Sequence, residues 1–243
     1  MNLIIDVGNS FVKLAVFKSS KLLHKEVVEH HLILNQFNLL IKKYNLINKG
    51  IISSVGKLKK TQIKSIGKHL DLLVLDSNTK LPFKNLYKTP KTLGVDRIAL
   101  VCASVEQFPD KNVLIIDAGT CITYDFVNVK NEYLGGAISP GLNMRYKSLN
   151  NLTANLPLLS SKKPKDIIGN STKDSIHSGV VNGIVNEIDG VIVNYKLKYP
   201  DLTVILTGGD ANFLSKQLKS SIFALPNFLI EGLNYILQFN TNE

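Results

Sequence analysis

One short pattern occurs twice in this chain, and the repeat constrains the fold more than any other feature. Residues 3–17 read LIIDVGNSFVKLAVF, and residues 114–127 read LIIDAGTCITYDFV. Each copy has an apolar run that ends in an aspartate, then a turn with a glycine, then a second apolar run, which is the pattern of a hairpin. One copy alone would indicate no more than a plain hairpin turn. Two copies offset by 111 residues predict two related α/β halves, residues 1–111 and 112–243.

After the first copy, the apolar spacing predicts a helix and then a βαβ unit. The expected elements are, in chain order, a helix over 31–44, a strand over 50–56 that ends in a glycine turn, a helix from about residue 59, a strand over 72–76, an irregular connection over 77–92, and a helix from 94 or 95 to 108.

The second copy begins a meander of three strands, VLIID, CITYDFV and EYLGGAI. Ser139 and Pro140 then predict the start of a helix, with the serine as N-cap and the proline at the first helical position. The later elements are a strand within 203–211 that runs into a glycine turn, a helix that this turn opens, and a last amphipathic helix over 226–237.

The best predicted helix covers residues 174–195, where apolar residues recur at spacings of three and four. Ser171 and Asp174 stand in capping-box register just before it. Three glycines interrupt the helix, which costs stability unless a second helix or backbone approaches closely there. Dimerisation through this helix is therefore a hypothesis that the pattern raises.

The composition is that of an ordinary globular protein, with 44% apolar and 20% charged residues. No apolar run approaches the roughly 18 residues that a membrane-spanning helix needs, and the N-terminus has no basic region typical of a signal peptide. Cys102 and Cys121 provide neither a disulfide framework nor metal-ligand spacing. His30 and His31 have no acidic or cysteine partners at metal spacing and are expected to be solvated. A cytoplasmic protein without membrane partners is the expectation.

The net charge of +10 raises the possibility of nucleic-acid binding, but the distribution of the charge argues against it. Of the 29 basic residues, 27 are lysines spread along the whole chain, and no aromatic residues are interleaved with them. A solvated lysine surface explains this pattern, so no nucleic-acid partner is expected. Because the chain otherwise uses lysine, Arg97 and Arg145 indicate two positions that need a planar guanidinium.

The two Asp-x-Gly turns have a specific chemical use. Glycine and small residues let backbone N–H groups approach a phosphate, and hydroxyl or amide side chains add donors. The aspartate can hold Mg²⁺ or its water, which neutralises phosphate charge. Two such turns that face each other can bind a nucleoside triphosphate from both sides. The TGGDA segment at 207–211 presents flat backbone against which a ring or sugar could lie.

Seven segments in order resemble type III pantothenate kinase: DVGNS, TLGVDRIALV, DAGT, GGAISPGL, the Leu-Pro after TAN, GNST and TGGDA. TLGVDR is the most specific of them. The wider resemblance is to the superfamily of acetate and sugar kinases, heat-shock ATPases and actin. It implies an α/β fold of two ribonuclease H-like (actin-like) halves facing across a nucleotide cleft. It also implies phosphorylation of pantothenate by ATP in coenzyme A synthesis, a homodimer, and a need for Mg²⁺ and a monovalent cation, K⁺ or NH₄⁺.

The resemblance also implies a set of site residues. Asp96 corresponds to the general base, and Asp117 to the ligand of the monovalent cation. The ATP contacts correspond to Asp6, Val7, Gly8, Asn9, Ser10, Phe11, Val12, Lys13 and Thr120. The pantothenate contacts correspond to Tyr87, Gly94, Val95, Asp96, Arg97 and Thr172. Ser10 and Cys121 depart from the commonest residues of the family, threonine and alanine, without removing an acid or a glycine.

The chemistry supports Asp96 and Arg97 in these roles independently. Phosphoryl transfer to a primary alcohol needs a group that accepts the hydroxyl proton late in the reaction. A carboxylate beside an arginine stays ionised, and the arginine can bind a substrate carboxylate bidentately. Because neighbours in sequence usually point apart, Arg97 can serve a different part of the site than Asp96.

Three other functions stay open at this level. A kinase for another small alcohol, or an ATPase, would share the two turns, although TLGVDR favours pantothenate. A non-catalytic regulator can retain a kinase fold, but the intact Asp6, Asp96 and Asp117 argue against it. Nucleic-acid binding through the lysine surface would show a steep salt dependence.

Overall fold

The computed structural model describes residues 1–54 and 58–241. The glycine turn predicted at the end of the 50–56 strand lies outside the described residues. Contacts divide the chain into two compact units. Unit 1 comprises Met1–Pro109, Asn131–Tyr133 and Asn227–Glu243, and unit 2 comprises Asp110–Lys130 and Leu134–Pro226. The last segment of the chain thus groups with the first, whereas the sequence alone suggests one division near residue 111.

Unit 1 contains a five-stranded sheet in the order β3-β2-β1-β4-β5. Its central strand β1 pairs antiparallel with β2 and parallel with β4, as expected for the apolar LIID run. The strands are β1 (Asn2–Val7), β2 (Val12–Lys18), β3 (Lys21–Val28), β4 (Lys49–Ser54) and β5 (Asp71–Val74). A short strand β6 (Lys84–Asn85) pairs with Glu132 and Tyr133 of the same unit.

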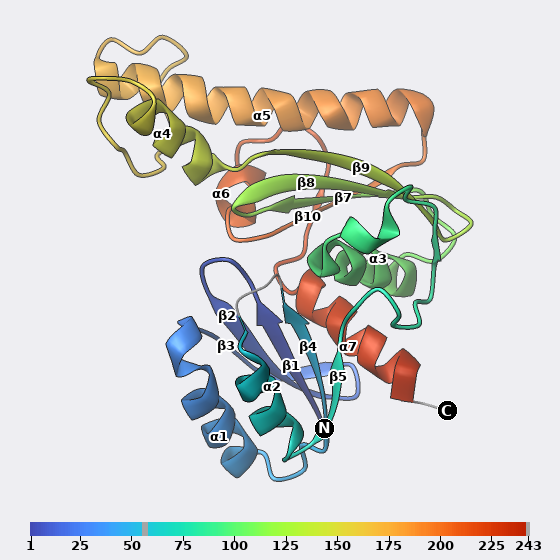
Figure 1. Cartoon of the computed structure of the whole chain (residues 1–243). Helices are drawn as coiled ribbons and strands as arrows, with labels where there is room; N and C mark the ends of the chain where they lie inside the picture. Colours follow the sequence, from blue (N-terminus) through green and yellow to red (C-terminus); the bar gives the residue numbers. More distant parts are fainter. Residues whose placement is uncertain (55–57, 242–243) are drawn as a thin grey trace. The chain divides into compact units, whose positions relative to one another are not determined.

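Helices cover both faces of this sheet (Figure 1). They are α1 (Ile33–Lys43), which follows the 3₁₀ turn η1 (His30–Leu32); α2 (Lys60–Gly67); α3 (Val95–Gln107), which follows the 3₁₀ turn η2 (Pro90–Thr92); and α7 (Phe228–Thr241). Leu3 and Ile5 pack with α1 and α2. Because side chains alternate along a strand, Ile4 and Asp6 face the opposite side, where α7 contacts β1.

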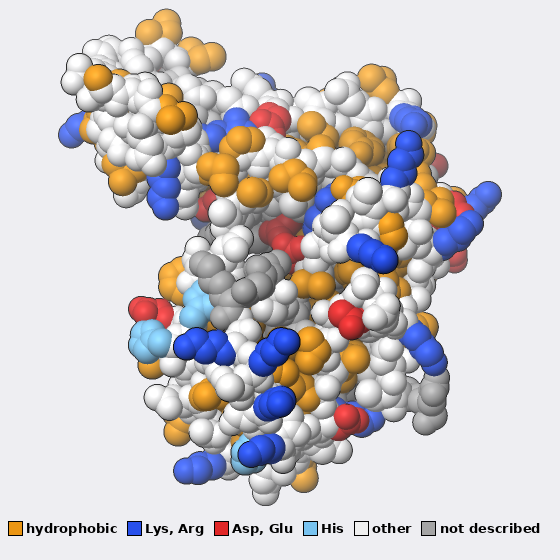
Figure 2. Space-filling view, in the orientation of Figure 1, with side chains coloured by type: hydrophobic (Ala, Val, Ile, Leu, Met, Phe, Trp, Pro, Cys, Tyr) orange, Lys and Arg blue, Asp and Glu red, His pale blue; other side chains and the backbone are white. Residues whose placement is uncertain are grey.

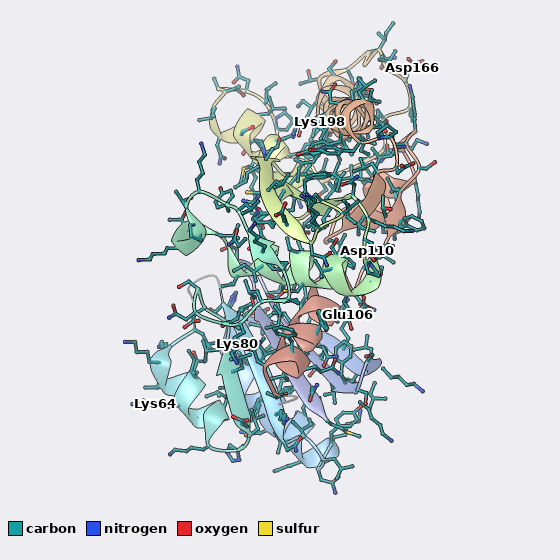
Figure 3. The ribbon with its side chains drawn as sticks, turned by 90° about the vertical axis from the view of Figure 1, so that its right-hand side faces the viewer. Lys64, Lys80, Glu106, Asp110, Asp166 and Lys198 are labelled. Carbon is teal, nitrogen blue, oxygen red and sulfur yellow. The ribbon has the colours of Figure 1, made fainter. Side chains whose placement is uncertain are left out.

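α7 also packs along α3, and Figures 1 and 3 show the two helices side by side. The approach is closest at Gly232, where a Cβ atom would lie 1.9 Å from the backbone oxygen of Ala99. A hydrogen bond of 2.9 Å from Gln107 Nε2 to Glu231 Oε2 joins the same helices. The helix α3, whose first turn carries the last three residues of TLGVDR, therefore packs against the C-terminal helix along its length.

Unit 2 repeats the strand order of unit 1. Its strands are β7 (Val113–Ala118), β8 (Cys121–Val127), β9 (Glu132–Pro140, whose first two residues group with unit 1), β10 (Thr203–Thr207) and β11 (Phe223–Ala224). The order β9-β8-β7-β10-β11 corresponds to β3-β2-β1-β4-β5. As in unit 1, the central strand pairs antiparallel with the next strand and parallel with a later one. The prediction of two related α/β halves is confirmed.

The helices of unit 2 are α4 (Leu142–Asn151), α5 (Thr172–Lys198) and α6 (Ala211–Ser215). α5 runs along the sheet (Figure 1), and its buried face shares a core with β7, β8 and β10. Ser171 is its N-cap and accepts a hydrogen bond of 3.2 Å from the backbone N–H of Asp174, as predicted. No helix among the described residues is long and apolar enough to cross a membrane.

Two details of the sequence-based assignment need correction. Ser139 and Pro140 do not start a helix, because β9 continues through Pro140, Gly141 is the N-cap, and α4 begins at Leu142. The backbone N–H of Gly141 bonds to the Thr120 oxygen at 3.2 Å, and this tertiary contact keeps the chain extended. In unit 1, β3 is an additional strand whose side chains alternate between exposed and half-buried.

Candidate active site

Asp6 lies near the end of β1, and its neighbours come from the strands on both sides. In the sheet register it is opposite Lys13 on β2 and Ser53 on β4. Lys13 Nζ lies 3.1 Å from Asp6 Oδ2, and Ser53 also hydrogen-bonds the carboxyl group. The residue is only 5% exposed. Burial raises the pKa of Asp6, and the lysine and serine oppose this by stabilising the carboxylate.

The turn that follows Asp6 is a closed hairpin loop. Val7 pairs with Val12, which leaves four residues in the loop, Gly8 to Phe11. The N–H of Gly8 bonds to the Phe11 oxygen at 3.0 Å, while the Phe11 side chain is 54% exposed. The predicted ATP contacts from Asp6 to Lys13 therefore form one compact group of backbone and side chains.

Asp96 lies in the first turn of α3, where its carboxylate folds back over the helix N-terminus. Asp96 Oδ1 accepts a hydrogen bond of 2.9 Å from the backbone N–H of Arg97. A helix N-terminus favours a negative charge at this position. Gly94 is the N-cap, and a Cβ atom there would lie 2.3 Å from Asp96 Oδ1. The glycine therefore leaves room for the position that the Asp96 carboxylate occupies.

Asp6 and Asp96 lie close enough to influence each other. The negative charge of Asp96 contributes to the raised pKa of Asp6. The physical reason for their proximity is the alternation of β1, which points Asp6 to the face on which α7 and α3 pack. Unit 1 thus brings together the predicted general base and the first predicted ATP turn.

Arg97 points into an aromatic environment. Its side chain is 6% exposed, and the guanidinium carbon lies 5.6 Å from the ring centre of Tyr87 and 6.0 Å from that of Tyr133. The two tyrosine rings are 5.9 Å apart. Cation–π attraction of this kind orients a guanidinium without neutralising it. Tyr87, Arg97 and Asp96 therefore belong to one group in unit 1.

Asp117 occupies in unit 2 the place that Asp6 occupies in unit 1. In the register it is opposite Thr123 on β8 and Thr207 on β10. The lysine and serine of unit 1 are thus replaced by two threonines. Gly208, with a φ of 97°, follows Thr207, and a Cβ atom there would lie 2.4 Å from Asp117 Oδ1.

Thr120 lies in the turn between β7 and β8. Ala118 pairs with Ile122, which leaves three residues in this loop, one fewer than in the first turn. The backbone N–H of Gly141 donates to the Thr120 oxygen, and a Cβ atom on Gly141 would lie 2.4 Å from that oxygen. The exposed Thr120 and the half-buried Asp117 come from the same turn, so the unit brings these two predicted site residues together.

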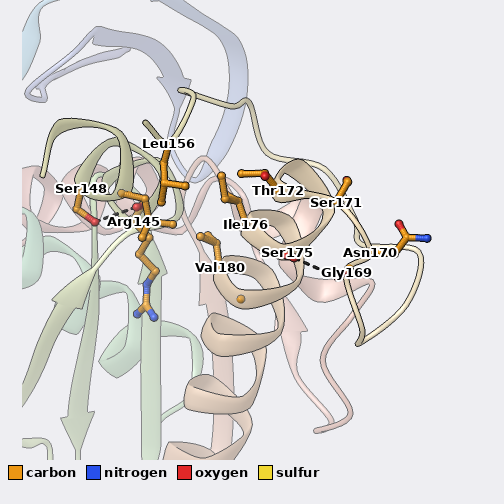
Figure 4. Close-up of a pocket in the computed structure, with 12 residues that line it drawn as sticks. Arg145, Ser148, Leu156, Gly169, Asn170, Ser171, Thr172, Ser175, Ile176 and Val180 are labelled. Carbon is orange, nitrogen blue, oxygen red and sulfur yellow. Dashed lines mark hydrogen bonds between the residues drawn. The ribbon is translucent and has the colours of Figure 1, made fainter. Parts of the chain in front are cut away.

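Thr172, the remaining predicted site residue, is the first residue of α5 and lines a different part of unit 2. It borders a hollow of about 1010 Å³ between α4, the start of α5 and the 169–171 segment (Figure 4). Neither Asp117 nor Thr120 is among the described residues that line this hollow. The wall is mixed, with hydroxyl groups from Ser171, Thr172 and Ser175 and apolar side chains such as Ile176.

Arg145 also lines this hollow and is held by a polar network. Its guanidinium donates to Glu187 Oε2, to Ser139 Oγ at 3.0 Å and to the Pro140 oxygen at 3.0 Å. Tyr124 donates to Glu187 Oε1 at 3.0 Å. Burial alone would raise the pKa of Glu187, but the hydrogen bonds it accepts hold that pKa below its ordinary value. The second arginine of the chain is thus fixed by a carboxylate.

Ser53 and Tyr133 were missed from the sequence, and Thr207 was singled out only as part of the TGGDA turn. Ser53, Tyr133 and Thr207 become neighbours of Asp6, Arg97 and Asp117 only through strand pairing and packing. The repeat indicates Ser53 and Thr207. In each half, the strand that pairs in parallel with the LIID strand must place one residue beside the aspartate of that LIID strand. No sequence pattern connects Tyr133 with Arg97.

The carboxylate oxygens of the two Asp-x-Gly turns are suitable ligands for hard cations whose other ligands are phosphate oxygens. No group of three or more His, Cys, Asp or Glu side chains among the described residues is arranged to hold a metal by itself. Mg²⁺ in phosphoryl-transfer sites is bound through one or two carboxylates, with phosphates and water as the other ligands. Asp6 in unit 1 and Asp117 in unit 2 each supply one carboxylate of this kind.

Comparison with known sequences places the chain in a family. A family model described as type III pantothenate kinase matches residues 2–194. A type III pantothenate kinase of Christiangramia forsetii is 54% identical over 243 residues and covers 100% of both chains. One of Flavobacterium johnsoniae is 47% identical over 243 residues, again with 100% of both chains covered.

Solved structures resemble this fold at low sequence identity. A Campylobacter jejuni protein described as a Baf family transcriptional activator matches with a TM-score of 0.66 at 22% identity, over 99% of this chain and 100% of that one. A glucokinase from an Antarctic psychrotroph matches with a TM-score of 0.56 at 10% identity, over 98% of both chains. These likenesses support the ribonuclease H-like fold of the sugar kinases. With the family match over most of its length, the chain belongs to the type III pantothenate kinase family.

Proposed function

We propose that this protein transfers the γ-phosphoryl group of ATP to the primary hydroxyl of pantothenate, which yields 4′-phosphopantothenate and ADP, the first step of coenzyme A biosynthesis. The observation that carries the proposal is the position of Asp96. The chain belongs to this kinase family. The Asp96 carboxylate is held at the start of α3, and its negative charge acts on the pKa of Asp6 in the first turn.

Asp96 is the general base in this proposal. Its Oδ1 accepts the N–H of Arg97, and we assign Oδ2 to the substrate hydroxyl. The hydroxyl proton passes to Asp96 as the oxygen forms its bond to the γ-phosphorus and the bond to the ADP oxygen breaks. Gly94 and Val95 let substrate approach this carboxylate at the helix start.

Arg97 binds the carboxylate end of pantothenate. Pantothenate carries a carboxylate at the end opposite its hydroxyl, and a guanidinium can bind such a group with two parallel hydrogen bonds. The rings of Tyr87 and Tyr133 orient the guanidinium. Thr172 contributes a further pantothenate contact through its hydroxyl group, from the hollow at the start of α5.

The two Asp-x-Gly turns bind the nucleotide and its cations. The loop from Asp6 to Lys13 contacts the phosphates, with Thr120 as a second contact. ATP and a divalent metal are requirements of a kinase of this type. Asp6 would hold Mg²⁺ or its water, and Asp117 a monovalent cation, K⁺ or NH₄⁺. The cations would neutralise phosphate charge. We place the reaction in the cytoplasm, because ATP is an intracellular metabolite.

A homodimer is the assembly that we propose. The outer side of α5 and neighbouring segments of unit 2 expose large apolar side chains: Ile138 at 63%, Leu152 at 82%, Ile167 at 75%, Ile168 at 79% and Leu197 at 80%. Figure 2 shows hydrophobic side chains at the surface over α4 and the segment after it, with lysine and arginine dispersed over both units. Apart from the nearby backbone of α5 itself, no described residue comes within 4 Å of a Cβ atom added at Gly179, Gly183 or Gly190, which leaves space for a partner helix.

We expect sedimentation at micromolar concentration to give the mass of a dimer. Gly183→Gln should shift the protein toward monomer, because the Cβ atom it adds has no neighbour within 4 Å outside the backbone of its own helix and the side chain would occupy the space proposed for the partner. A monomeric mass for the unaltered protein would contradict the assembly.

The test of the function is pantothenate-dependent release of ADP. With ATP, Mg²⁺ and K⁺ present, the purified protein should release ADP on addition of pantothenate, and mass spectrometry should detect 4′-phosphopantothenate. ADP release that is independent of pantothenate would indicate an ATPase, and release stimulated only by another alcohol would indicate a different kinase.

A further inference from the structure

His30 contacts the first phosphate turn, although the sequence gives it no role and predicts it to be solvated. It begins η1, directly after β3, and its side chain is half-buried. Its Nε2 atom lies 2.9 Å from the backbone oxygen of Gly8. Since a carbonyl oxygen only accepts, the ring nitrogen is the donor.

The sheet register explains how a residue 22 positions away reaches this turn. Val7 at the end of β1 pairs with Val12 at the start of β2, and Val12 pairs with Val28 at the end of β3. The chain therefore leaves β3 at the same end of the sheet where Gly8 opens the hairpin loop. His30 follows two residues later, and its side chain contacts the Gly8 oxygen in the loop.

This contact fixes the direction of a backbone donor. In a trans peptide, the C=O of one residue and the N–H of the next lie in one plane and point in opposite directions. No described peptide bond is cis. A hydrogen bond that holds the Gly8 oxygen toward His30 therefore aims the N–H of Asn9 to the opposite side. Glycine at position 8 would otherwise leave this peptide plane unusually free to rotate.

We infer that His30 is a positioning residue for ATP binding: by holding the Gly8 carbonyl, it fixes the orientation of the Gly8–Asn9 peptide in the turn that binds the phosphates of the nucleotide. The inference rests on the proposed role of residues 6–13 in binding ATP. His30 itself contacts neither phosphate nor the reacting atoms. It acts through the turn, and its effect should appear in nucleotide affinity rather than in the chemical step.

The chain offers a matched control in the neighbouring residue. His31 is the same residue type, its side chain is 70% exposed, and its Nδ1 atom lies 3.3 Å from Glu29 Oε2. Replacing either histidine by alanine removes the same atoms from neighbouring positions of η1. His30→Gln provides the conservative variant, because the glutamine amide supplies an N–H donor at a similar reach.

The experiment compares the full-length protein with His30→Ala, His30→Gln and His31→Ala. The readouts are the dissociation constant of a non-hydrolysable ATP analogue by calorimetry, the KM for each substrate, kcat, and the melting temperature without nucleotide. His30→Ala should raise the ATP KM and the analogue's dissociation constant about three- to tenfold, the range expected for the loss of one hydrogen bond. The pantothenate KM, kcat and melting temperature should stay close to those of the unaltered protein, and His30→Gln and His31→Ala should bind nucleotide normally.

Three results would overturn the inference. The first is unchanged nucleotide affinity in His30→Ala. The second is equal weakening by His30→Ala and His30→Gln, which would show that a donor at this position does not matter. The third is a joint rise of both KM values with a lower melting temperature, which would mean a role in the fold. If the unaltered protein binds the analogue but ignores pantothenate, the proposed function fails while the calorimetry still decides the role of His30. If it does not bind the analogue, the inference fails.

Discussion

Asp96→Asn is expected to lower kcat by about 10²- to 10⁴-fold, the usual contribution of a general base, while the affinity for nucleotide changes little. The amide keeps the shape of the side chain and can still accept the N–H of Arg97 through its oxygen. It cannot accept the proton of the substrate hydroxyl. Because the phosphate turn is intact, the loss should appear in the chemical step. Steady-state kinetics together with calorimetry of an ATP analogue separates the two effects.

Two further variants sharpen this prediction. Gly94→Ala places a methyl group 2.3 Å from the Asp96 oxygen, and it should lower kcat with little change in melting temperature because a side chain, not backbone, has to move. Glu106→Gln lies on the same helix but near its other end and should leave kcat within about twofold. If turnover survives in Asp96→Asn while nucleotide affinity collapses, the carboxylate serves ATP binding and not proton transfer.

Asp6→Asn should lower kcat/KM for MgATP by about 10²- to 10³-fold, the range seen when one electrostatic contact to the reacting groups is removed. The substitution removes the charge that would hold Mg²⁺ and that pairs with Lys13 at 3.1 Å. Lys13, whose side chain is 40% exposed, would then lie beside a neutral amide that is buried. The loss should be only partly relieved by raising the Mg²⁺ concentration. Kinetics over a matrix of ATP and Mg²⁺ concentrations measures it.

Asp117→Asn is the matched variant in the second copy of the repeat and should respond to a different ion. Two threonines lie opposite Asp117 in the sheet register, at the positions that correspond to the lysine and serine opposite Asp6. We expect the K⁺ concentration for half-maximal activity to rise at least about tenfold, because the carboxylate that we propose as a ligand of the cation becomes a neutral amide. Equal Mg²⁺ and K⁺ responses in the two variants would contradict the division of roles between the aspartates.

Much of the fold was predictable because local patterns and tertiary environment agree. The LIID runs are apolar enough to be central strands, and they occupy the centre of both sheets. The α5 helix has strong apolar spacing and a correct N-cap at Ser171. The prediction failed at Ser139–Pro140, where good helix-start residues are held in β9 by the contact between Gly141 and Thr120. It omitted β3, whose half-buried residues carry a weak pattern.

The sequence by itself determined the repeat, the family and the identity of the acids, because these depend on residue order and spacing. The tertiary structure alone decided which groups meet. Asp96 comes near Asp6 because β1 alternation and helix packing put both on one face. Tyr133 lies by Arg97, and His30 by Gly8, because chain segments distant in sequence converge. Such contacts depend on the summed packing of many residues, and no local pattern records them.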